Sequence, residues 1–468
     1  MRRTKIVATI GPASRDLEVL KRMIDAGMDV ARFNFSHGDN ETHAENAERV
    51  RAAASAVGRQ VAILQDLPGP KLRVGMIQNE IASLRSGQDL ILLAGSSEVG
   101  NDQRLSVTWE GLAEAVETDD VIYLADGKIR LRVKAVRAGA GEVETEVEVG
   151  GDVASRQGLN IPGSTRGLDA VPAADLEKLK FGESIGVDMV ALSFVRSADD
   201  VNTVREHTNL PLIAKIEKPQ AVDAAEEIIR AADCVMVARG DLGIELPIEE
   251  VPLAQKRLLK LAGSMGRPAI TATQMLDSMV ASPRPTRAEA TDVANAIFDG
   301  TDAVMLSQES AVGQYPVETV AMMASICEHT ERSLPYEQWN ETRIVRDHRD
   351  PAYTIAYSAC MAARDLELAA IVTPTVTGRS ARLISAHRPD VPIIALSPDR
   401  DVVRRMALVW GVEGAYMPDH EVTETMIAES CRRVVELGLV KPGERVVVTA
   451  GLPSGRTGTT SLIQIQQV

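Results

Sequence analysis

Two neighbouring stretches of the sequence could bring one ammonium group and two carboxylates together. In the run IAKIEKP, Lys215 and Glu217 are two residues apart, so on a strand they would share a face. The next apolar run, VMVARGDLGIE, passes into Asp241. Two carboxylates from neighbouring strand ends suit Mg²⁺, and a lysine beside them could stabilise charge that develops on a phosphate. The alternative that the residues leave open is a buried structural Lys–Glu pair.

The second stretch also contains the tripeptide Arg239-Gly240-Asp241, which occurs in adhesion loops. That interpretation needs an exposed loop of a secreted protein, and the surrounding apolar run indicates neither. At a strand end, Gly240 would instead leave its backbone N–H open to a closely approaching ligand.

Polar side chains alternate with apolar ones in ARFNFSHG. Arg32, Asn34 and Ser36 would point one way on a strand, and the two phenylalanines the other. Three polar groups on one side of a strand end suggest a site, although an ordinary half-exposed strand is the alternative. Thr273 in ITATQML and Ser307 in VMLSQES end later apolar runs in the same way. Because threonine is common in strands, only the position of Thr273 at a strand end makes it a candidate.

Strand-like apolar runs alternate with amphipathic helical stretches through most of the chain. Eight such strands with intervening helices predict a (β/α)8 barrel, in the α/β class, over residues 1–71 and 159–336. Residues 72–158 break this rhythm with alternating strand patterns and glycines, which indicates an inserted β-rich, barrel-like lid domain. Residues 337–468 alternate again and predict a C-terminal doubly wound α/β domain.

The composition narrows the classes of partner. The 468 residues carry a net charge of -15, which argues against nucleic acid or an anionic membrane as the main partner. The four cysteines lie far apart without a CxxC motif, so neither disulfides nor a zinc site is expected, and a reducing cytoplasm fits. No apolar run reaches about 18 residues, so no membrane span is expected, and the start of the chain does not read as a signal peptide.

Nine motifs lie along the chain: TKIVATIGPAS, ARFNFSHG, QDLPGPKLR, LKFGESIGVDMVALSFVR, AKIEKP, VMVARGDLGIE, ATQMLDSM, PTRAEATDVANAIFDGTDAVMLS and GQYPVETV. Together they resemble the pyruvate kinase family; the resemblance runs from Thr4 to near the C-terminus, and it is most specific in the barrel and looser in the other two domains. It implies a phosphotransferase that moves the phosphoryl group of phosphoenolpyruvate to ADP, giving pyruvate and ATP in glycolysis. It also implies a cytoplasmic, allosterically regulated homotetramer.

The resemblance also assigns roles by position. Glu217 and Asp241 would hold Mg²⁺ or Mn²⁺, and a second ion would arrive with ADP. The resulting enolate of pyruvate would be protonated through Thr273, with Ser307 and water. The implied catalytic residues are Lys215, Thr273, Arg32, Arg73 and Ser307; the substrate contacts are Arg32, Lys215, Gly240, Asp241 and Thr273; the nucleotide contacts are Arg73, Asn34, His37, Pro12 and Arg156.

Departures from the family pattern change two expectations. The monovalent-cation positions match Asn34, Ser36, Asp66 and the backbone oxygen of Leu67, but Lys71 stands where K⁺-dependent members have Glu. An ammonium there could supply the charge of K⁺, so we expect K⁺ not to be required; the alternative is that Lys71 only packs at the lid hinge. In the lid, Gln157 stands where the family usually has lysine, and whether Arg156 replaces that nucleotide contact is open.

One further segment, between a strand and a helix of the C-terminal domain, resembles an effector-phosphate loop. Backbone donors at a helix start suit a phosphate, although an ordinary helix cap is the alternative. The final loop, GLPSGRTGTT, lacks the Trp and Arg pattern of fructose-1,6-bisphosphate-activated relatives, which favours a sugar monophosphate or nucleotide monophosphate. The effector residues are Thr375, Thr377, Gly378, Arg379 and Ser380.

Two other functions remain open. The chain could be another barrel enzyme acting on phosphoenolpyruvate or the pyruvate enolate, such as a lyase or aldolase. It could also be a catalytically silent paralogue retained for effector binding, but that would predict loss of a metal ligand or of Lys215, and these are present.

Overall fold

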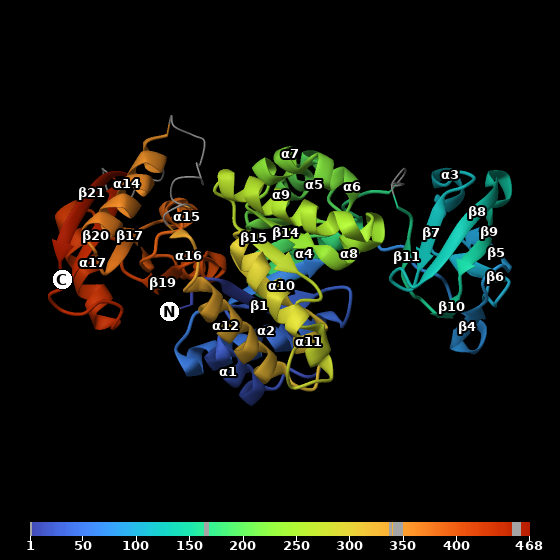
Figure 1. The fold of residues 1–468 in the computed structure, drawn as a ribbon, viewed down its shortest axis with the longest axis horizontal. Helices are drawn as coiled ribbons and strands as arrows, with labels where there is room; N and C mark the ends of the chain where they lie inside the picture. The colour runs from blue at the N-terminus through green and yellow to red at the C-terminus, as the bar shows by residue number, and fades with distance from the viewer. Residues whose placement is uncertain (1, 163–167, 337–338, 340–349, 452–459) are drawn as a thin grey trace.

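The computed structural model describes residues 2–162, 168–336, 339, 350–451 and 460–468. Figure 1 shows three bodies in a row: the barrel in the middle, the β-rich lid at one end and the C-terminal domain at the other. Among the described residues, no helix combines the length and apolar character needed to cross a membrane.

The central body is a closed barrel of eight parallel strands, which confirms the predicted (β/α)8 fold class. Nearly every strand residue is buried, because helices cover the outside and side chains fill the inside. In order around the barrel, the strands are β1 (Lys5–Thr9), β2 (Val30–Asn34), β3 (Ala62–Leu67), β12 (Met189–Leu192), β13 (Leu212–Ile216), β14 (Cys234–Ala238), β15 (Ala269–Ala272) and β16 (Ala303–Leu306).

Helices surround the barrel, and local caps fix where several of them begin. Asp16 caps α1 by accepting the N–H groups of Glu18 and Val19. The outer helices are α1 (Leu17–Ala26), α2 (Asn40–Val57), α4 (Ala173–Ser184), α5 (Ala198–Arg205), α6 (Pro219–Asp223), α7 (Ala225–Ala231), α8 (Arg239–Glu245), α9 (Val251–Ser264), α10 (Arg287–Phe298), α11 (Gln308–Ala311) and α12 (Pro316–Glu331), with 3-10 turns η3 (Ile248–Glu250) and η4 (Asp277–Val280).

Four aspartates tie the strands together at the amino-terminal foot of the barrel. Each one directly precedes a strand and accepts a backbone N–H from the start of the preceding barrel strand. The same bond therefore links neighbouring strands in pairs: β1 with β2, β3 with β12, β13 with β14, and β15 with β16. Buried carboxylates need such donors. The pairs are Asp29 with Ile6 (2.8 Å), Asp188 with Ile63 (2.7 Å), Asp233 with Leu212 (3.0 Å) and Asp302 with Ala269 (2.9 Å).

The lid is inserted between β3 and α4 and has its own apolar core. Its main sheet has the order β11-β7-β8-β9-β5-β6. Because β11 (Leu159–Asn160) pairs with β7, the predicted start of the returning barrel segment at residue 159 falls two residues inside the lid sheet. The other elements are η1 (Gln78–Glu80), β4 (Ile81–Leu84), β5 (Asp89–Ala94), β6 (Arg104–Val107), α3 (Leu112–Ala115), β7 (Val121–Leu124), β8 (Ile129–Arg137), η2 (Ala138–Ala140), β9 (Glu142–Val149) and β10 (Gly151–Ala154).

The C-terminal domain is a five-stranded sheet of order β19-β18-β17-β20-β21, with only β21 antiparallel. It docks on the barrel foot: buried Arg388 bonds to Asp302 at 2.8 Å, and Lys5 Nζ donates to the carbonyl of Val412. Its elements are α14 (Pro351–Asp365), β17 (Ala370–Pro374), α15 (Arg379–Ala386), β18 (Ile393–Ser397), α16 (Arg400–Arg405), η5 (Met406–Leu408), β19 (Val412–Tyr416), α17 (Thr423–Glu436), β20 (Arg445–Gly451) and β21 (Thr460–Gln467).

Candidate active site

The carboxyl ends of the barrel strands gather the strongest cluster of charges. Strand β13 carries Lys215, whose Nζ lies 2.8 Å from Oε1 of Glu217 and 3.3 Å from Oδ1 of Asp66. The same ammonium donates a 2.7 Å hydrogen bond to Oγ of Ser193. Lys215, Glu217 and Asp66 are all buried, so these charges interact with little solvent screening.

A second cation completes the cluster from strand β2. The Arg32 Nε atom donates to Oδ2 of Asp66 at 2.7 Å, and its Nη1 donates to the hydroxyl of Thr9 at 2.8 Å. The alternation of ARFNFSHG therefore places the guanidinium inside the barrel mouth, while Phe33 packs in the core. Asp66 lies between Arg32 and Lys215.

The electrostatics of the cluster leave one carboxylate poorly compensated. Burial opposes ionisation of Asp66, but Lys215 and Arg32 outweigh it and lower its pKa. Burial also opposes the charged form of Lys215, but Asp66, Glu217 and Asp241 outweigh it and raise its pKa. Burial raises the pKa of Glu217, and repulsion from Asp241 adds to it despite Lys215. Three carboxylates thus face two cations.

This donor set fits a divalent cation. Glu217 directly follows β13 and Asp241 lies in the first turn of α8, so both acids come from adjacent strand ends and are close enough to raise the pKa of Glu217. Across the described parts of the chain, no group of three or more His, Cys, Asp or Glu forms a metal site. Glu217 and Asp241 would contribute two carboxylates and leave other positions to water or substrate oxygens, as Mg²⁺ sites do.

Helix α8 is fixed by Arg239, the residue before Gly240. Its guanidinium pairs with Asp292 at 2.7 Å and donates to the carbonyl of Thr273 at 2.9 Å. Asp241 is exposed, but Arg239-Gly240-Asp241 forms the first turn of helix α8 and its arginine is paired with Asp292, so the tripeptide is not an adhesion loop. The Gly240 N–H donates to Oγ1 of Thr273 at 2.7 Å, so it would have to exchange that partner to reach a substrate carboxylate.

Thr273 follows β15 in an unusual backbone conformation. Its φ of 70° lies in the left-handed region, which is costly for a β-branched residue and concentrates at functional sites. Its hydroxyl donates to the carbonyl of Ala272 and accepts from Gly240. Ser307 follows β16, and its N–H donates to the buried Glu309 carboxylate at 2.7 Å. Both residues therefore lie at strand ends, as the sequence predicts.

The turn after β2 brings together residues predicted for the nucleotide and the monovalent cation. Asn34 Oδ1 accepts the N–H of Ser36 at 3.1 Å, and Asn34 pairs in register with Asp66. The pKa of His37 is lowered by burial and then by Lys71, Arg73 and Arg32, so positive charge gathers on this side of the mouth. Leu67 ends β3, and Pro12 is exposed in the turn after β1.

The lid contributes Arg73 and Arg156 near its connections to the barrel. The Arg73 guanidinium donates to the Arg156 carbonyl at 2.8 Å, while Arg156 itself is exposed. The side chain of Gln157 accepts the N–H of Ala154 and so caps a lid turn. At the lid tip, a Cβ built on Gly127 would lie 3.5 Å from Ile244 of α8, so the lid approaches the side of the mouth that carries Asp241.

The predicted effector residues lie in the C-terminal domain, apart from the barrel mouth. Gly378 has φ of 76° and its N–H donates to Oγ1 of Thr375 at 3.0 Å, directly before α15. Arg379 pairs with Asp350, and Ser380 Oγ lies 2.8 Å from Oγ1 of Thr460. The Thr377 carbonyl accepts from Arg382. The predicted final loop falls almost entirely at residues 452–459, outside the described residues.

Two contacts at the mouth were missed by sequence reasoning. Ser193, which directly follows β12, accepts the Lys215 ammonium, and Arg239 holds α8. For Ser193 the signal was present, since it is a polar residue at the end of the apolar run DMVAL. The partner of Arg239 lies 53 residues away and has no local signal.

Comparison with known proteins agrees with this geometry. The chain matches the family described as pyruvate kinase, barrel domain, over residues 1–320, and the pyruvate kinase alpha/beta domain over residues 353–466. It is 46% identical to pyruvate kinase of Geobacillus stearothermophilus, covering 100% of this chain and 80% of the relative, and 39% identical to that of Clostridium acetobutylicum, covering 100% of both. The crystal structure of a pyruvate kinase from Cryptosporidium parvum superposes with a TM-score of 0.93 at 33% identity, over 100% of this chain and 96% of that one. The chain therefore belongs to the pyruvate kinase family.

Proposed function

We propose that the cluster of Lys215, Glu217 and Asp241 carries out the phosphotransferase reaction of this family. The family's substrates are phosphoenolpyruvate and ADP, and its members depend on a divalent metal. The observation that carries the assignment is the buried Lys215 ammonium, held by Glu217 and Asp66 at the carboxyl ends of the barrel strands. Chemistry in such barrels gathers at that end.

In the proposed reaction, a β-phosphate oxygen of ADP attacks the phosphorus of phosphoenolpyruvate, and the bond from phosphorus to the enol oxygen breaks. Lys215 stabilises the negative charge on the transferring group, because its position among carboxylates keeps it protonated. Arg32 adds a second cation from β2, and Arg73 a third from the lid side. The leaving enolate of pyruvate then takes a proton on carbon.

Glu217 and Asp241 would hold the divalent cation, which supplies neutralising charge to the phosphate and carboxylate oxygens of the substrate. The chain's own contribution is to orient both acids: Glu217 Oε2 accepts the N–H of Phe194 at 2.9 Å, while α8 places Asp241. A second ion arrives with the nucleotide.

Thr273 is the proposed proton-relay residue. Its ordinary hydroxyl pKa is far too high for a free acid, so it would pass a proton from water together with Ser307. The supporting observations are its strained backbone and its hydrogen bond with Gly240, which place the hydroxyl beside the proposed substrate-carboxylate donors. Pro12, Asn34, His37 and Arg156 would line the nucleotide side.

The enzyme is proposed to work without K⁺. Asn34, Ser36, Asp66 and Leu67 gather at the ends of β2 and β3, but the Asp66 carboxylate is already engaged by Arg32 and Lys215. Lys71 supplies a positive charge on the same side, since it contributes to lowering the pKa of His37.

Regulation is proposed to act through the loop at Thr375–Ser380, with a sugar monophosphate or nucleotide monophosphate as the effector. The loop precedes α15, whose first backbone N–H groups could bind a phosphate. A homotetramer in the cytoplasm, with neither nucleic acid nor membrane as a partner, remains our expectation from sequence.

A direct assay separates the proposed reaction from the alternatives. Pyruvate should form from phosphoenolpyruvate only when both ADP and Mg²⁺ are present, in tetramethylammonium buffer and without K⁺. Pyruvate formation independent of ADP would support a lyase or phosphatase reaction, and its absence under all conditions would support a silent effector-binding paralogue.

A further inference from the structure

The lid is joined to the barrel by two connections, and one buried carboxylate links them. The outgoing connection, residues 68–71, leaves the end of β3; the returning connection runs from the end of β11 to the start of α4. Asp175 lies in the first turn of α4, and its Oδ2 accepts the N–H of Gly69 at 2.8 Å. A side chain on the returning side therefore holds the backbone of the outgoing side.

Asp175 is a costly residue to keep at this position. The residue is only 4% exposed, and Nζ of Lys178, on the same helix, lies 4.0 Å from its Oδ1. Burial raises the pKa of its carboxyl even though the Gly69 N–H and Lys178 act in the opposite direction. A buried carboxyl needs a specific hydrogen bond to offset the loss of water, and the Gly69 N–H supplies one.

Gly69 itself is pressed against the segment that follows β12. Its φ of 69° lies in the left-handed region, and a Cβ there would come within 2.8 Å of the Phe194 ring and 3.1 Å of Ser193 Cβ. Neither the torsion nor the space allows another residue without a shift. The bond to Asp175 thus holds the outgoing connection in close contact with Ser193 and Phe194.

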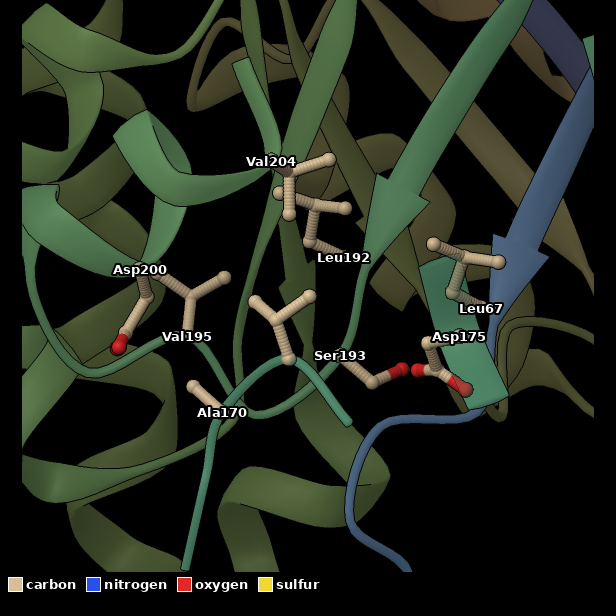
Figure 2. A pocket seen from close by; sticks show the side chains of 9 residues that line it. Leu67, Ala170, Asp175, Leu192, Ser193, Val195, Asp200 and Val204 are labelled. Carbon is tan, nitrogen blue, oxygen red and sulfur yellow. The ribbon is translucent and has the colours of Figure 1, made fainter. Parts of the chain in front are cut away.

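Ser193 and Phe194 in turn touch the two groups on which the reaction depends. Ser193 Oγ accepts the Lys215 ammonium at 2.7 Å, and the Phe194 N–H donates to Glu217 at 2.9 Å. Figure 2 shows the side chains of Asp175 and Ser193 pointing toward each other; both line a small cavity, together with Leu67 of β3 and Ala170 of the returning connection. The cavity lies where both lid connections meet the barrel.

We propose that Asp175 is a positioning residue: it fixes the outgoing lid connection on Ser193–Phe194 and thereby sets the placement of Lys215 and Glu217. The effect is transmitted from Asp175 to Gly69, then to the segment after β12, and finally to the reacting groups. This inference rests on the function proposed for Lys215 and Glu217, but its exchange test below does not.

The matched variants are Asp175→Ala, Asp175→Asn and Asp200→Ala. Asp200 lines the same cavity, but it caps α5 by accepting the N–H groups of Arg196 and Ser197, and within the described residues it makes no hydrogen bond to either lid connection. Asp175→Asn keeps an oxygen that can accept from Gly69. A purely structural role would make the two alanine variants behave alike.

Hydrogen exchange can report on Gly69 almost by itself. Pro68 and Pro70 have no backbone N–H, so only the amide hydrogens of Gly69 and Lys71 exchange within residues 68–71. We expect exchange in this segment to be about tenfold faster in Asp175→Ala than in the wild type, Asp175→Asn or Asp200→Ala. If Asp175→Ala fails to fold, the wild type alone remains decisive: an unprotected Gly69 amide would overturn the proposal.

In the kinetic test, Asp175→Ala should lower kcat about tenfold, while KM for phosphoenolpyruvate stays within about twofold. The reason is that misplaced Lys215 and Glu217 would stabilise the transition state less well. Asp175→Asn should restore kcat. The proposal is overturned if Asp175→Ala keeps wild-type kcat, or if Asp200→Ala lowers it equally. An inactive wild type would refute the assigned reaction. If hydrogen exchange were still faster in Asp175→Ala than in that wild type, the Asp175–Gly69 link would stand.

Discussion

Nζ of Lys215 lies 2.8 Å from Oε1 of Glu217, and both side chains are buried at the mouth of the barrel. The pair does not stand alone, because Asp66 shares the ammonium and Asp241 repels Glu217. A buried pair with excess negative charge is weak evidence for stability but a suitable arrangement for binding a cation. The account of the reaction depends on this relationship.

Replacement of Lys215 tests its role in phosphoryl transfer. Lys215→Met should lower kcat by about 10²–10³-fold, because it removes one preorganised charge next to the transferring group. KM for phosphoenolpyruvate should change less than kcat. The exposed Lys180 provides the control, since Lys180→Met should leave kcat unchanged. A Lys215→Met enzyme with near wild-type turnover would remove this residue from the mechanism.

The response to K⁺ tests the assignment of Lys71. The wild type should be fully active in tetramethylammonium buffer, whereas Lys71→Glu should lose activity there and regain it on addition of K⁺. The reason is that the variant replaces the Lys71 ammonium with the carboxylate that we expect at this position in K⁺-dependent members of the family. Initial rates across a K⁺ titration give the answer. A large activation of the wild type by K⁺ would contradict the prediction.

The raised pKa of Glu217 predicts how pH changes stabilisation by metal. Burial favours the carboxylic acid in the folded state. Glu217 therefore adds stability that is present below its unfolded pKa and is lost as pH rises through the raised folded pKa. Mg²⁺ should restore stability above that pKa, so the Mg²⁺-induced rise in Tm should be largest at neutral pH and shrink on acidification, before an ordinary glutamate would protonate.

Thermal unfolding with and without Mg²⁺, from neutral pH down to about pH 5, measures this effect. Glu217→Gln should show a small Mg²⁺ shift at every pH. A shift in the wild type that is independent of pH over this range would show that Glu217 is not the group concerned.

The contact between the barrel and the C-terminal domain should be sensitive to Arg388. This guanidinium is 1% exposed, bonds to Asp302 and the Gly300 carbonyl, and lies 4.6 Å from the centre of the Trp410 ring. Arg388→Met should destabilise the protein by about 3–5 kcal/mol, because it leaves the Asp302 charge buried and unpaired.

Urea and thermal unfolding measure that loss, and the double variant Arg388→Met/Asp302→Asn should recover part of it. The surface residue Arg432, which pairs with Glu429 and Glu436 on α17, is the control, and Arg432→Met should unfold like the wild type. Strictly additive losses in the double variant would mean that Arg388 and Asp302 do not interact.

The features that follow from local periodicity could be predicted from the sequence. Residues two apart on a strand share a face, so Lys215 with Glu217 could be placed together before any coordinates. Alternation of strands and helices gave the barrel class, and the barrel puts strand ends at one mouth. The sequence predicts that the lid ends at residue 158, but Leu159–Asn160 still belongs to the lid sheet. This short strand is defined by its pairing with β7, which no local pattern indicates.

The contacts that could not be predicted from the sequence join residues that lie far apart along the chain. The capture of the Gly240 N–H by Thr273 joins residues 33 apart, and the pairing of Arg239 with Asp292 joins residues 53 apart. The link between Asp175 and Gly69 spans the whole lid, 106 residues. The pKa of Glu217 likewise depends on burial and on neighbours from other strands, which no local pattern encodes.

Glu217 and Asp241 are proposed to share one divalent cation beside Lys215. Titration of Mn²⁺ followed by electron paramagnetic resonance, without nucleotide, measures this site directly. The wild type should bind one Mn²⁺ per chain. The control variant Glu177→Gln, which changes an exposed glutamate, should bind the same amount. Glu217→Gln and Asp241→Asn should each weaken that binding by at least about tenfold. Unchanged Mn²⁺ binding in either of these two variants would contradict the claim.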